Sequence, residues 1–497
     1  MNSSTDTGTV LRAKDLLRKP FTAEFLRYVI PGILVGVITG LVVGTFRWII
    51  DQTLILLTIV YPYLGSHPLM IIPYILGTLI VVWLIAKIIR PELFDIVGSG
   101  VPQIEAILIG KHQMNWWSVL WRKFVSGLLT ICPGLFLGRE GPCIQIGACI
   151  GQGFAEDVYH YQNTEERDLL IKCGIAAGLS AAFSAPIAGT VFLLEEVTRH
   201  SNFKVIAGAL AAAISADLMT ILFFGTKPCL AMPISMRLPL SSYPWLILVG
   251  IVIGAGGYLF QYGILNLGWW YRKFTILPNY YHSILPLLLV IPVGLWNCHI
   301  LGGSHNFIMY ITQMSLKTNW LLVLGMLILF FVLRYTGTMI AAGATVPGGI
   351  FMPIFVLGSL LGAIAGIILI HFNIIPASCY LNLIAMGMAA YFGATEGTPI
   401  SAILLVTEMV GSVDQILPMT ILTFIAYFTS MTLGAKNSIY EALRMEMLAK
   451  LECEPAEDLR KANNFSRLDA ESIWEGGCCL WGLPCEHIST QLPRTLA

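Results

Sequence analysis

The sequence predicts an all-α polytopic membrane protein with many helices, several of them tilted or partial, in two repeated halves. Of its 497 residues, 56% are hydrophobic and only 12% are charged. A soluble domain usually carries about 25% charged residues, so this composition favours a chain that faces lipid over much of its surface. Similarity between segments of the two halves of the chain predicts the repetition.

Apolar blocks follow one another along most of the chain. About 20 apolar residues cross the hydrocarbon core of a bilayer as a helix, and several blocks reach that length. Others are too short or are interrupted by glycine and proline, which predicts partial or re-entrant helices that are shielded by protein. The blocks cover residues 29–60, 71–89, 118–137, 169–194, 205–225, 245–268, 284–299, 320–333, 350–371, 381–394, 399–411 and 416–433.

Polar segments flank the apolar part, which divides the chain into residues 1–28, a membrane domain over 29–450 and a short tail over 451–497. The first segment is rich in lysine and arginine, which favours a cytoplasmic N-terminus. The 29 basic residues balance the 29 acidic ones, so nothing indicates a nucleic-acid partner. Three cysteines of the tail have a spacing that fits no zinc pattern well, and we expect no metal and no cofactor: Cys478, Cys479 and Cys485.

Two pairs of segments match in the same order and define the repeat. "GREGPCIQIGACIG" (138–151) aligns with "GIFMPIFVLGSLLG" (349–362) at an offset of 211 residues. "PIAGTVFLLEE" (186–196) aligns with "PISAILLVTEM" (399–409) at an offset of 213 residues. Chance similarity between glycine- and proline-rich helices is the alternative. The near-constant offset favours two halves of similar structure, roughly 29–225 and 245–435, and broken helices from such halves often build a substrate site.

The same alignment separates two kinds of glutamate. Glu140 aligns with Phe351 and Glu196 aligns with Met409, so the scaffold accepts an apolar side chain at both places. We therefore expect Glu140 and Glu196 to be functional. The remaining two glutamates match each other, which favours a shared structural role: Glu195 and Glu408.

Three glycine- and proline-containing segments share one design: "GSGVP" (98–102), "GREGP" (138–142) and "GGIFMP" (348–353). Each precedes an apolar, helix-like run. Proline suits the first helical turn, and glycine lets the backbone approach a ligand closely. Helix starts at membrane depth aim free N–H groups and a positive dipole end at an anion, and so predict an anion site without a full positive charge. The residues of these starts are Gly98, Gly100, Pro102, Gly138, Arg139, Gly141, Pro142, Gly348, Gly349 and Pro353.

Four side chains have candidate roles, and three of them have a second interpretation. Ser99 supplies a hydroxyl donor to the site or is an ordinary helix N-cap. Glu140 and Glu196 are costly in the membrane, at about 2.5–3.5 kcal/mol on insertion scales, unless they are protonated, which suits a proton carrier. Glu140 could instead pair with Arg139, although adjacent residues of a helix do not face each other. Lys123 raises the potential for an anion or snorkels at the end of a span.

These motifs resemble the CLC family of chloride channels and chloride/proton exchangers. "GSGVP", "GREGP", "GGIFMP" and "GLSAAFSAPIAGTVFLLEEV" occur in the family's order, and the resemblance runs from about residue 29 to 445. The family's usual isoleucine in the first motif is Val101 here, a change between apolar residues. The resemblance implies two inverted halves and a homodimer with one pathway per subunit. It also implies that no enzymatic activity is present, and no "HExxH" motif or Ser/His pair favours an intramembrane enzyme.

The resemblance also assigns roles. It implies a central chloride site formed by Ser99, the backbone amides around Ile350 and Phe351, and Tyr440. Glu140 resembles the external gating glutamate, and Glu196 resembles the internal proton glutamate of exchangers. We therefore expect a chloride/proton antiporter, with a passive chloride channel gated by the outer glutamate as the alternative. Ser99 favours chloride over nitrate. The lack of paired nucleotide-sensing domains is typical of prokaryotic members, which implies the cell (inner) membrane.

Overall fold

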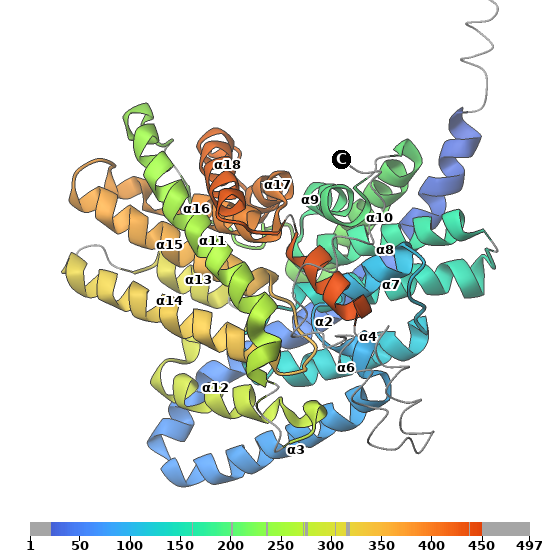
Figure 1. The fold of residues 1–497 in the computed structure, drawn as a ribbon, viewed down its shortest axis with the longest axis horizontal. Coiled ribbons are helices and arrows are strands. Elements are labelled where there is room, and N and C mark those ends of the chain that lie inside the picture. Colours follow the sequence, from blue (N-terminus) through green and yellow to red (C-terminus); the bar gives the residue numbers. More distant parts are fainter. Residues whose placement is uncertain are drawn as a thin grey trace, which may run out of the picture.

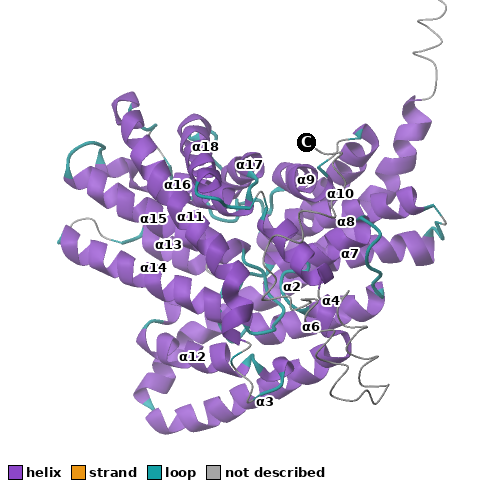
Figure 2. Ribbon diagram, in the orientation of Figure 1, coloured by secondary structure: helices purple, strands orange, loops and turns teal. Residues whose placement is uncertain are grey.

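Helices and loops build the described part of the chain, in which no β-strand occurs (Figure 2). The structure is a computed structural model that describes residues 21–449 except 162, 200–201, 235–236, 272, 274–276, 304, 315–318 and 437. Most of the expected N-terminal segment and the whole cysteine-containing tail lie outside the described residues. Within the described residues, eight helices are long and apolar enough to cross a membrane. The predicted all-α membrane architecture is confirmed.

The first half of the chain runs from α2 to α10. Its helices differ widely in length, as the interrupted apolar blocks predict. They are α2 (Phe21–Ser66), α3 (Ile71–Ile89), α4 (Leu93–Ile96), α5 (Val101–Leu108), α6 (Trp116–Ile131), α7 (Glu140–Gly153), α8 (Thr164–Phe183), α9 (Pro186–Phe192) and α10 (Phe203–Phe224). A π-helical turn, Leu193–Thr198, extends α9.

The second half repeats this order. Its helices are α11 (Tyr243–Tyr271), α12 (Ile284–Trp296), α13 (His305–Thr312), α14 (Trp320–Gly343), α15 (Phe351–His371), α16 (Tyr380–Glu396), α17 (Pro399–Val410) and α18 (Ile416–Thr432). A last helix follows over residues 439–449. The sequence did not predict α13, which is short and falls between apolar blocks.

The packing of the helices confirms the internal repeat. α7 packs on α8, α8 on α2 and α2 on α10, and the same relations join α15 to α16, α16 to α11 and α11 to α18. Figure 1 shows α7 to α10 on one side and α15 to α18 on the other, with α9 facing α17 where the halves meet. The two halves therefore have one architecture.

Glycine pairs allow the equivalent helix crossings in both halves. A Cβ on Gly147 would lie 2.1 Å from the carbonyl oxygen of Gly174, where α7 crosses α8. At the corresponding crossing of α15 and α16, a Cβ on Gly358 would lie 2.5 Å from the carbonyl oxygen of Gly387. Small residues let membrane helices approach backbone to backbone, so these glycines set the spacing on which the site depends.

The sequence predicts one continuous apolar segment over residues 169–194, whereas the structure has two helices there, α8 and α9. α8 ends where Ser184 adopts a left-handed conformation with φ 54°, and Pro186 then begins α9. The equivalent break separates α16 from α17 at Gly397, with φ 79°. A left-handed residue ends a helix by bonding its N–H back to the last turn, and the proline that follows cannot continue that helix.

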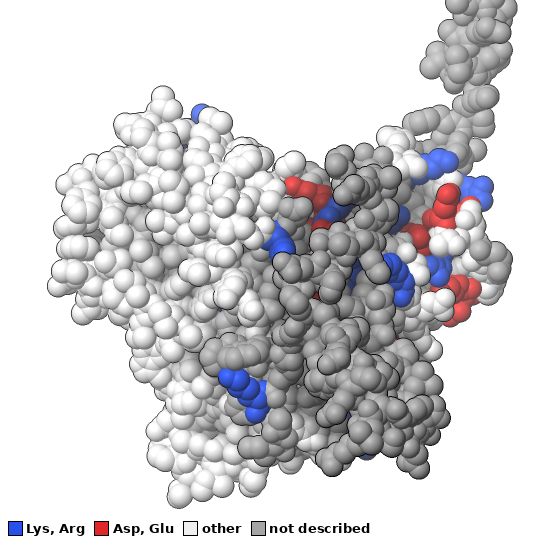
Figure 3. Space-filling view, viewed as in Figure 1, with Lys and Arg blue, Asp and Glu red and all other residues white. Residues whose placement is uncertain are grey.

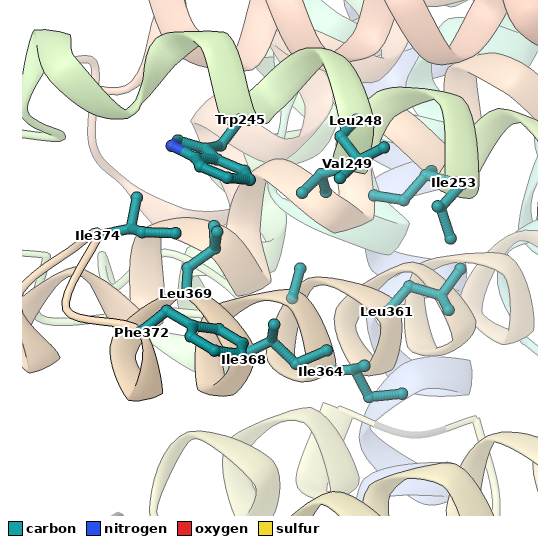
Figure 4. A pocket seen from close by; sticks show the side chains of 12 residues that line it. Trp245, Leu248, Val249, Ile253, Leu361, Ile364, Ile368, Leu369, Phe372 and Ile374 are labelled. Atoms are coloured by element: carbon teal, nitrogen blue, oxygen red, sulfur yellow. The ribbon is translucent and has the colours of Figure 1, made fainter.

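The outer surface is apolar over much of the second half. Figure 3 shows one face, on which charged side chains gather over the side of α7 and α8 and are rare over the side of α14 to α16. An apolar groove of about 570 Å³ opens between α11 and α15, and Figure 4 shows Trp245, Leu248, Ile364 and Phe372 among its lining side chains. All the lining side chains are apolar, so this groove offers nothing that binds an ion.

Candidate functional site

The three glycine- and proline-containing segments meet at the centre of the fold. The N–H of Gly98 donates to the carbonyl of Val346 at 3.0 Å, and the N–H of Gly348 donates to the carbonyl of Gly98 at 3.1 Å. Gly138 and Gly349 exchange two N–H···O bonds of 2.7 and 2.8 Å. Segments far apart in the sequence are thus joined by backbone hydrogen bonds.

This junction brings the starts of α5, α7 and α15 together. Pro102 is the second residue of α5, and Pro142 and Pro353 are the third residues of α7 and α15. Ile350 caps α15, with no side-chain hydrogen bond to its first turn. The free N–H groups and positive dipole ends of three helices therefore gather in one region, as the sequence predicts.

Two hydroxyls lie beside these helix starts. The Ser99 oxygen accepts a 3.3 Å bond from the N–H of Val101, which leaves its own O–H free to donate. The Tyr440 hydroxyl neighbours the Ser99 hydroxyl, is fully buried and has no hydrogen-bond partner of normal geometry. Its ring stacks on Phe351 with the ring centroids 5.7 Å apart. The structure thus brings together Ser99, Phe351 and Tyr440.

Glu140 is the first residue of α7 and is fully buried. Neither of its carboxyl oxygens has a hydrogen-bond partner among the described residues. The side chain folds back over Gly138, because a Cβ on that glycine would lie 2.2 Å from Oε2 of Glu140. The carboxyl is thus held by packing between helix starts, in the region where an anion would be attracted.

Arg139 does not neutralise Glu140 closely. Its guanidinium forms a hydrogen-bonded ion pair with Asp51 of α2, whereas its Nε lies 3.9 Å from Oε1 of Glu140 without a hydrogen bond. The alternative pairing of Glu140 with Arg139 therefore occurs only as a long ion pair without a hydrogen bond, and the closer partner of Arg139 is Asp51. Arg139, whose partner could not be predicted from the sequence, is anchored to α2.

Glu196 lies on another side of the site, in the π-helical turn after α9. It is 2% exposed, and its Oε1 accepts a hydrogen bond from the Ser438 hydroxyl. The hydroxyl oxygen of Ser438 also accepts a 3.1 Å bond from the N–H of Tyr440, which links Glu196 to the region of the two hydroxyls. π-helical turns are rare and occur frequently at functional sites.

Two ion pairs lie near Glu196. Arg444 pairs with Glu105 at 3.0 Å, and Arg199 pairs with Glu441 at 2.6 Å. Each arginine therefore already has a carboxylate partner, and Glu196 is held by a neutral hydroxyl rather than by a cation.

Lys123 lies inside the protein, beside the backbone that precedes Ser99. Its ammonium group is fully buried and donates to the carbonyl oxygens of Ile96 at 2.7 Å and Gly98 at 2.8 Å. The expectation of a snorkelling lysine is wrong, because the side chain points into the protein. Lys123 binds the backbone next to Ser99 and so positions the start of α5.

Glu195 and Glu408 each cap the start of a helix in the opposite half of the repeat. The Glu195 carboxylate accepts bonds from the N–H groups of Ile400 at 3.1 Å and Ser401 at 2.6 Å, at the start of α17. Glu408 accepts bonds from the N–H groups of Ile187 at 3.2 Å and Ala188 at 2.8 Å, at the start of α9. The predicted structural role of this matched pair is confirmed.

Sequence reasoning missed three residues near the site. They are Asp51, the partner of Arg139; Ser438, the donor to Glu196; and Glu396, a buried carboxyl at the end of α16. Glu396 falls in the gap between two apolar blocks, so hydropathy did not mark it. Among the described residues, no group of three or more His, Cys, Asp or Glu side chains could hold a metal ion.

Known proteins resemble the chain over most of its length. The sequence model of the family described as "Voltage gated chloride channel" matches residues 77–431. The "H(+)/Cl(-) exchange transporter ClcA" of Yersinia pestis bv. Antiqua (strain Angola) is 30% identical over 433 residues, which cover 84% of this chain and 87% of the relative.

Two solved structures have a similar fold. The crystal structure of a slow cyanobacterial Cl⁻/H⁺ antiporter superposes with a TM-score of 0.74 at 28% identity, over 85% of this chain and 98% of that one. The crystal structure of a CLC-type fluoride/proton antiporter gives a TM-score of 0.65 at 22% identity, over 85% of this chain and 99% of that one. The second likeness concerns the fold alone.

Proposed function

We propose that this chain, which belongs to the voltage gated chloride channel family, is a chloride/proton antiporter of the membrane whose two halves are inverted repeats. One observation carries the proposal: two buried carboxyls, Glu140 and Glu196, lie near a region where three helix starts and two hydroxyls gather. Helix starts and hydroxyls suit an anion, and carboxyls without a cationic hydrogen-bond partner suit a proton.

Chloride occupies the central site in this proposal. The Ser99 and Tyr440 hydroxyls donate to it, together with the backbone N–H groups around Ile350 and Phe351. No lysine or arginine side chain is needed there, which suits transport, because binding must be weak enough for release. Lys123 acts on the site through the backbone that it holds.

Glu140 is the gate. When ionised, its carboxylate stands where an anion would stand, at the start of α7, and it competes with chloride. When it is protonated, the Glu140 carboxyl is no longer attracted by the positive ends of the helix dipoles, so it leaves the site and chloride can bind there. Glu196 takes up the proton on the other side and hands it toward Glu140, so that chloride and protons move in opposite directions.

The observation that favours the antiporter over the passive channel is Glu196. The equivalent position in the other half is Met409, which is fully buried as well, so the fold does not need a carboxyl there. The relatives are described as proteins that exchange H⁺ and Cl⁻, which also favours the antiporter.

A chloride gradient across liposomes that contain the purified protein tests the proposal. The antiporter should drive protons uphill, and a protein that only dissipates chloride would refute exchange and leave the channel. In the same liposomes, Glu196→Gln should abolish proton movement and keep chloride flux. Glu140→Ala should remove proton coupling and most of the pH dependence of chloride flux. Normal coupling in either variant would refute the role of that residue.

The assembly and topology belong to the same proposal. We infer a homodimer with one pathway per subunit, located in the cell (inner) membrane with the N-terminus in the cytoplasm. α9, α10, α17 and α18 expose large apolar side chains near the contact of the two halves, among them Ile187, Leu222, Leu417 and Phe428. Residues 29–450 would form the transport domain, in halves 29–225 and 245–435. Cross-linking in native membranes would detect the dimer.

A further inference from the structure

Glu396 is a buried carboxyl that the proposed exchange mechanism does not yet use. It is the last residue of α16 and has no exposed surface. Neither Oε1 nor Oε2 has a hydrogen-bond partner among the described residues. The carboxyls that cap helices in this protein accept two or more N–H bonds, so Glu396 differs from them.

Among the described residues, Glu396 forms no ion pair with a lysine, an arginine or a histidine. The two arginines near Glu196 are paired, Arg444 with Glu105 at 3.0 Å and Arg199 with a glutamate of the last helix at 2.6 Å. A buried carboxylate without donors is too costly to persist, so Glu396 carries a proton in this arrangement.

The fold does not require a carboxyl at this position. At the offset of 213 residues that aligns α9 with α17, Glu396 corresponds to Phe183, the last residue of α8. Both residues are fully buried, and both precede the left-handed residue that ends the helix, Ser184 and Gly397. The same scaffold therefore accepts an apolar side chain here, as it does opposite Glu140 and Glu196.

Contacts at the end of α16 place Glu396 close to the segment that contains Ser438 and Tyr440. One turn before Glu396 on α16, the ring of Phe392 lies 5.2 Å from the ring of Phe351, which in turn stacks on Tyr440. Gln261 of α11 donates to the carbonyl oxygens of Thr395, the neighbour of Glu396, at 3.3 Å and of Lys436, two residues before Ser438, at 3.0 Å. The end of α16 that carries Glu396 is thus joined to the segment with Ser438, the donor to Glu196, and Tyr440.

We propose that Glu396 is a third proton-binding residue of the transport cycle, located between Glu196 and the outer glutamate. The inference rests on the proposed proton exchange. Glu396 releases its O–H proton, through intervening water, to the Glu140 carboxylate and becomes ionised. It then takes a proton from protonated Glu196, which becomes the carboxylate. One proton moves per passage, and no other reactant is needed.

The variant Glu396→Gln tests this role because it keeps the size of the side chain and removes its exchangeable acid proton. Liposomes that carry the variant should keep chloride flux within about twofold, while proton flux falls about tenfold or more. A purely structural role would lower both fluxes together. Glu396→Asp should restore part of the proton flux, because a carboxyl remains.

Thr395→Val is the matched control. Thr395 is the neighbouring residue, is equally buried and donates its hydroxyl to the Tyr391 carbonyl of its own helix at 2.7 Å. This variant should keep the proton-to-chloride ratio of the wild type. Because chloride flux reports a folded protein, E396Q with normal chloride flux and normal proton pumping would overturn the relay. A wild-type protein that does not pump protons would instead overturn the exchange itself.

Discussion

Gly138 gives the most direct test of where the Glu140 carboxyl acts. A Cβ at this glycine would lie 2.2 Å from Oε2 of Glu140, whereas ordinary contact begins near 3.4 Å. The variant Gly138→Ala therefore requires a shift of about 1.2 Å, the difference between those two distances. The nearest atoms of Met352 lie 3.2 Å from the added methyl group and need to move by only a few tenths of an ångström.

The end of a flexible side chain absorbs this shift, so G138A should fold normally. The ionised carboxylate should no longer occupy its position at the start of α7. Chloride flux at neutral pH should rise toward the flux at acid pH, where the wild-type carboxyl is protonated. If the displacement costs the ionised gate about 1 kcal/mol, the ratio of acid to neutral flux should fall about fivefold.

Chloride efflux from liposomes at acid and at neutral pH measures this ratio. Gly303→Ala is the control, because the nearest atom to its Cβ is the Leu137 carbonyl oxygen at 3.5 Å, an ordinary contact. Gly303 lines the same pocket as Glu140. A G138A protein that keeps the wild-type ratio, with G303A unchanged, would show that the carboxyl does not close the pathway from this position.

Three further variants test neighbouring contacts. Asp51→Asn removes the ion pair of Arg139 with Asp51, so that the Arg139 guanidinium attracts ionised Glu140 more strongly. The pH of half-maximal acid activation of chloride flux should therefore fall by about half to one pH unit, and a rise would contradict this. Tyr440→Phe removes one hydroxyl donor and should weaken chloride binding about fivefold by calorimetry, whereas unchanged affinity would exclude that donor. Glu195→Ala removes the cap of α17 and should lower the free energy of unfolding by about 1–2 kcal/mol. The proton-to-chloride ratio should stay normal, in contrast to variants of Glu196.

Apolar blocks and the glycine and proline residues at helix ends explain why so much of the fold could be predicted from the sequence. Apolar blocks mark helices because lipid selects for them, and the block over 71–89 coincides with α3. Proline in the first turn and glycine before it mark the three helix starts of the site. These signals act within a few residues, so one sequence shows them.

Contacts between distant segments were not predictable in the same way. Arg139 and its partner Asp51 are 88 residues apart, and the sequence around either residue does not indicate that the two form a pair. Lys123 near the end of an apolar block fits a snorkelling side chain as well as a buried one. Only the packing of α6 against the loop before Ser99 places its ammonium group on two backbone carbonyls.

The repeat supplies the signal that hydropathy lacks. A carboxyl that both halves share, such as Glu195 with Glu408, is explained by contacts between the halves, because each caps a helix of the other. A buried carboxyl present in one half only has no such explanation, since the equivalent site is filled by an apolar side chain. Glu140 and Glu196 meet that condition, and so does Glu396 opposite Phe183. The asymmetry of a duplicated scaffold therefore points to the three carboxyls for which we propose proton binding.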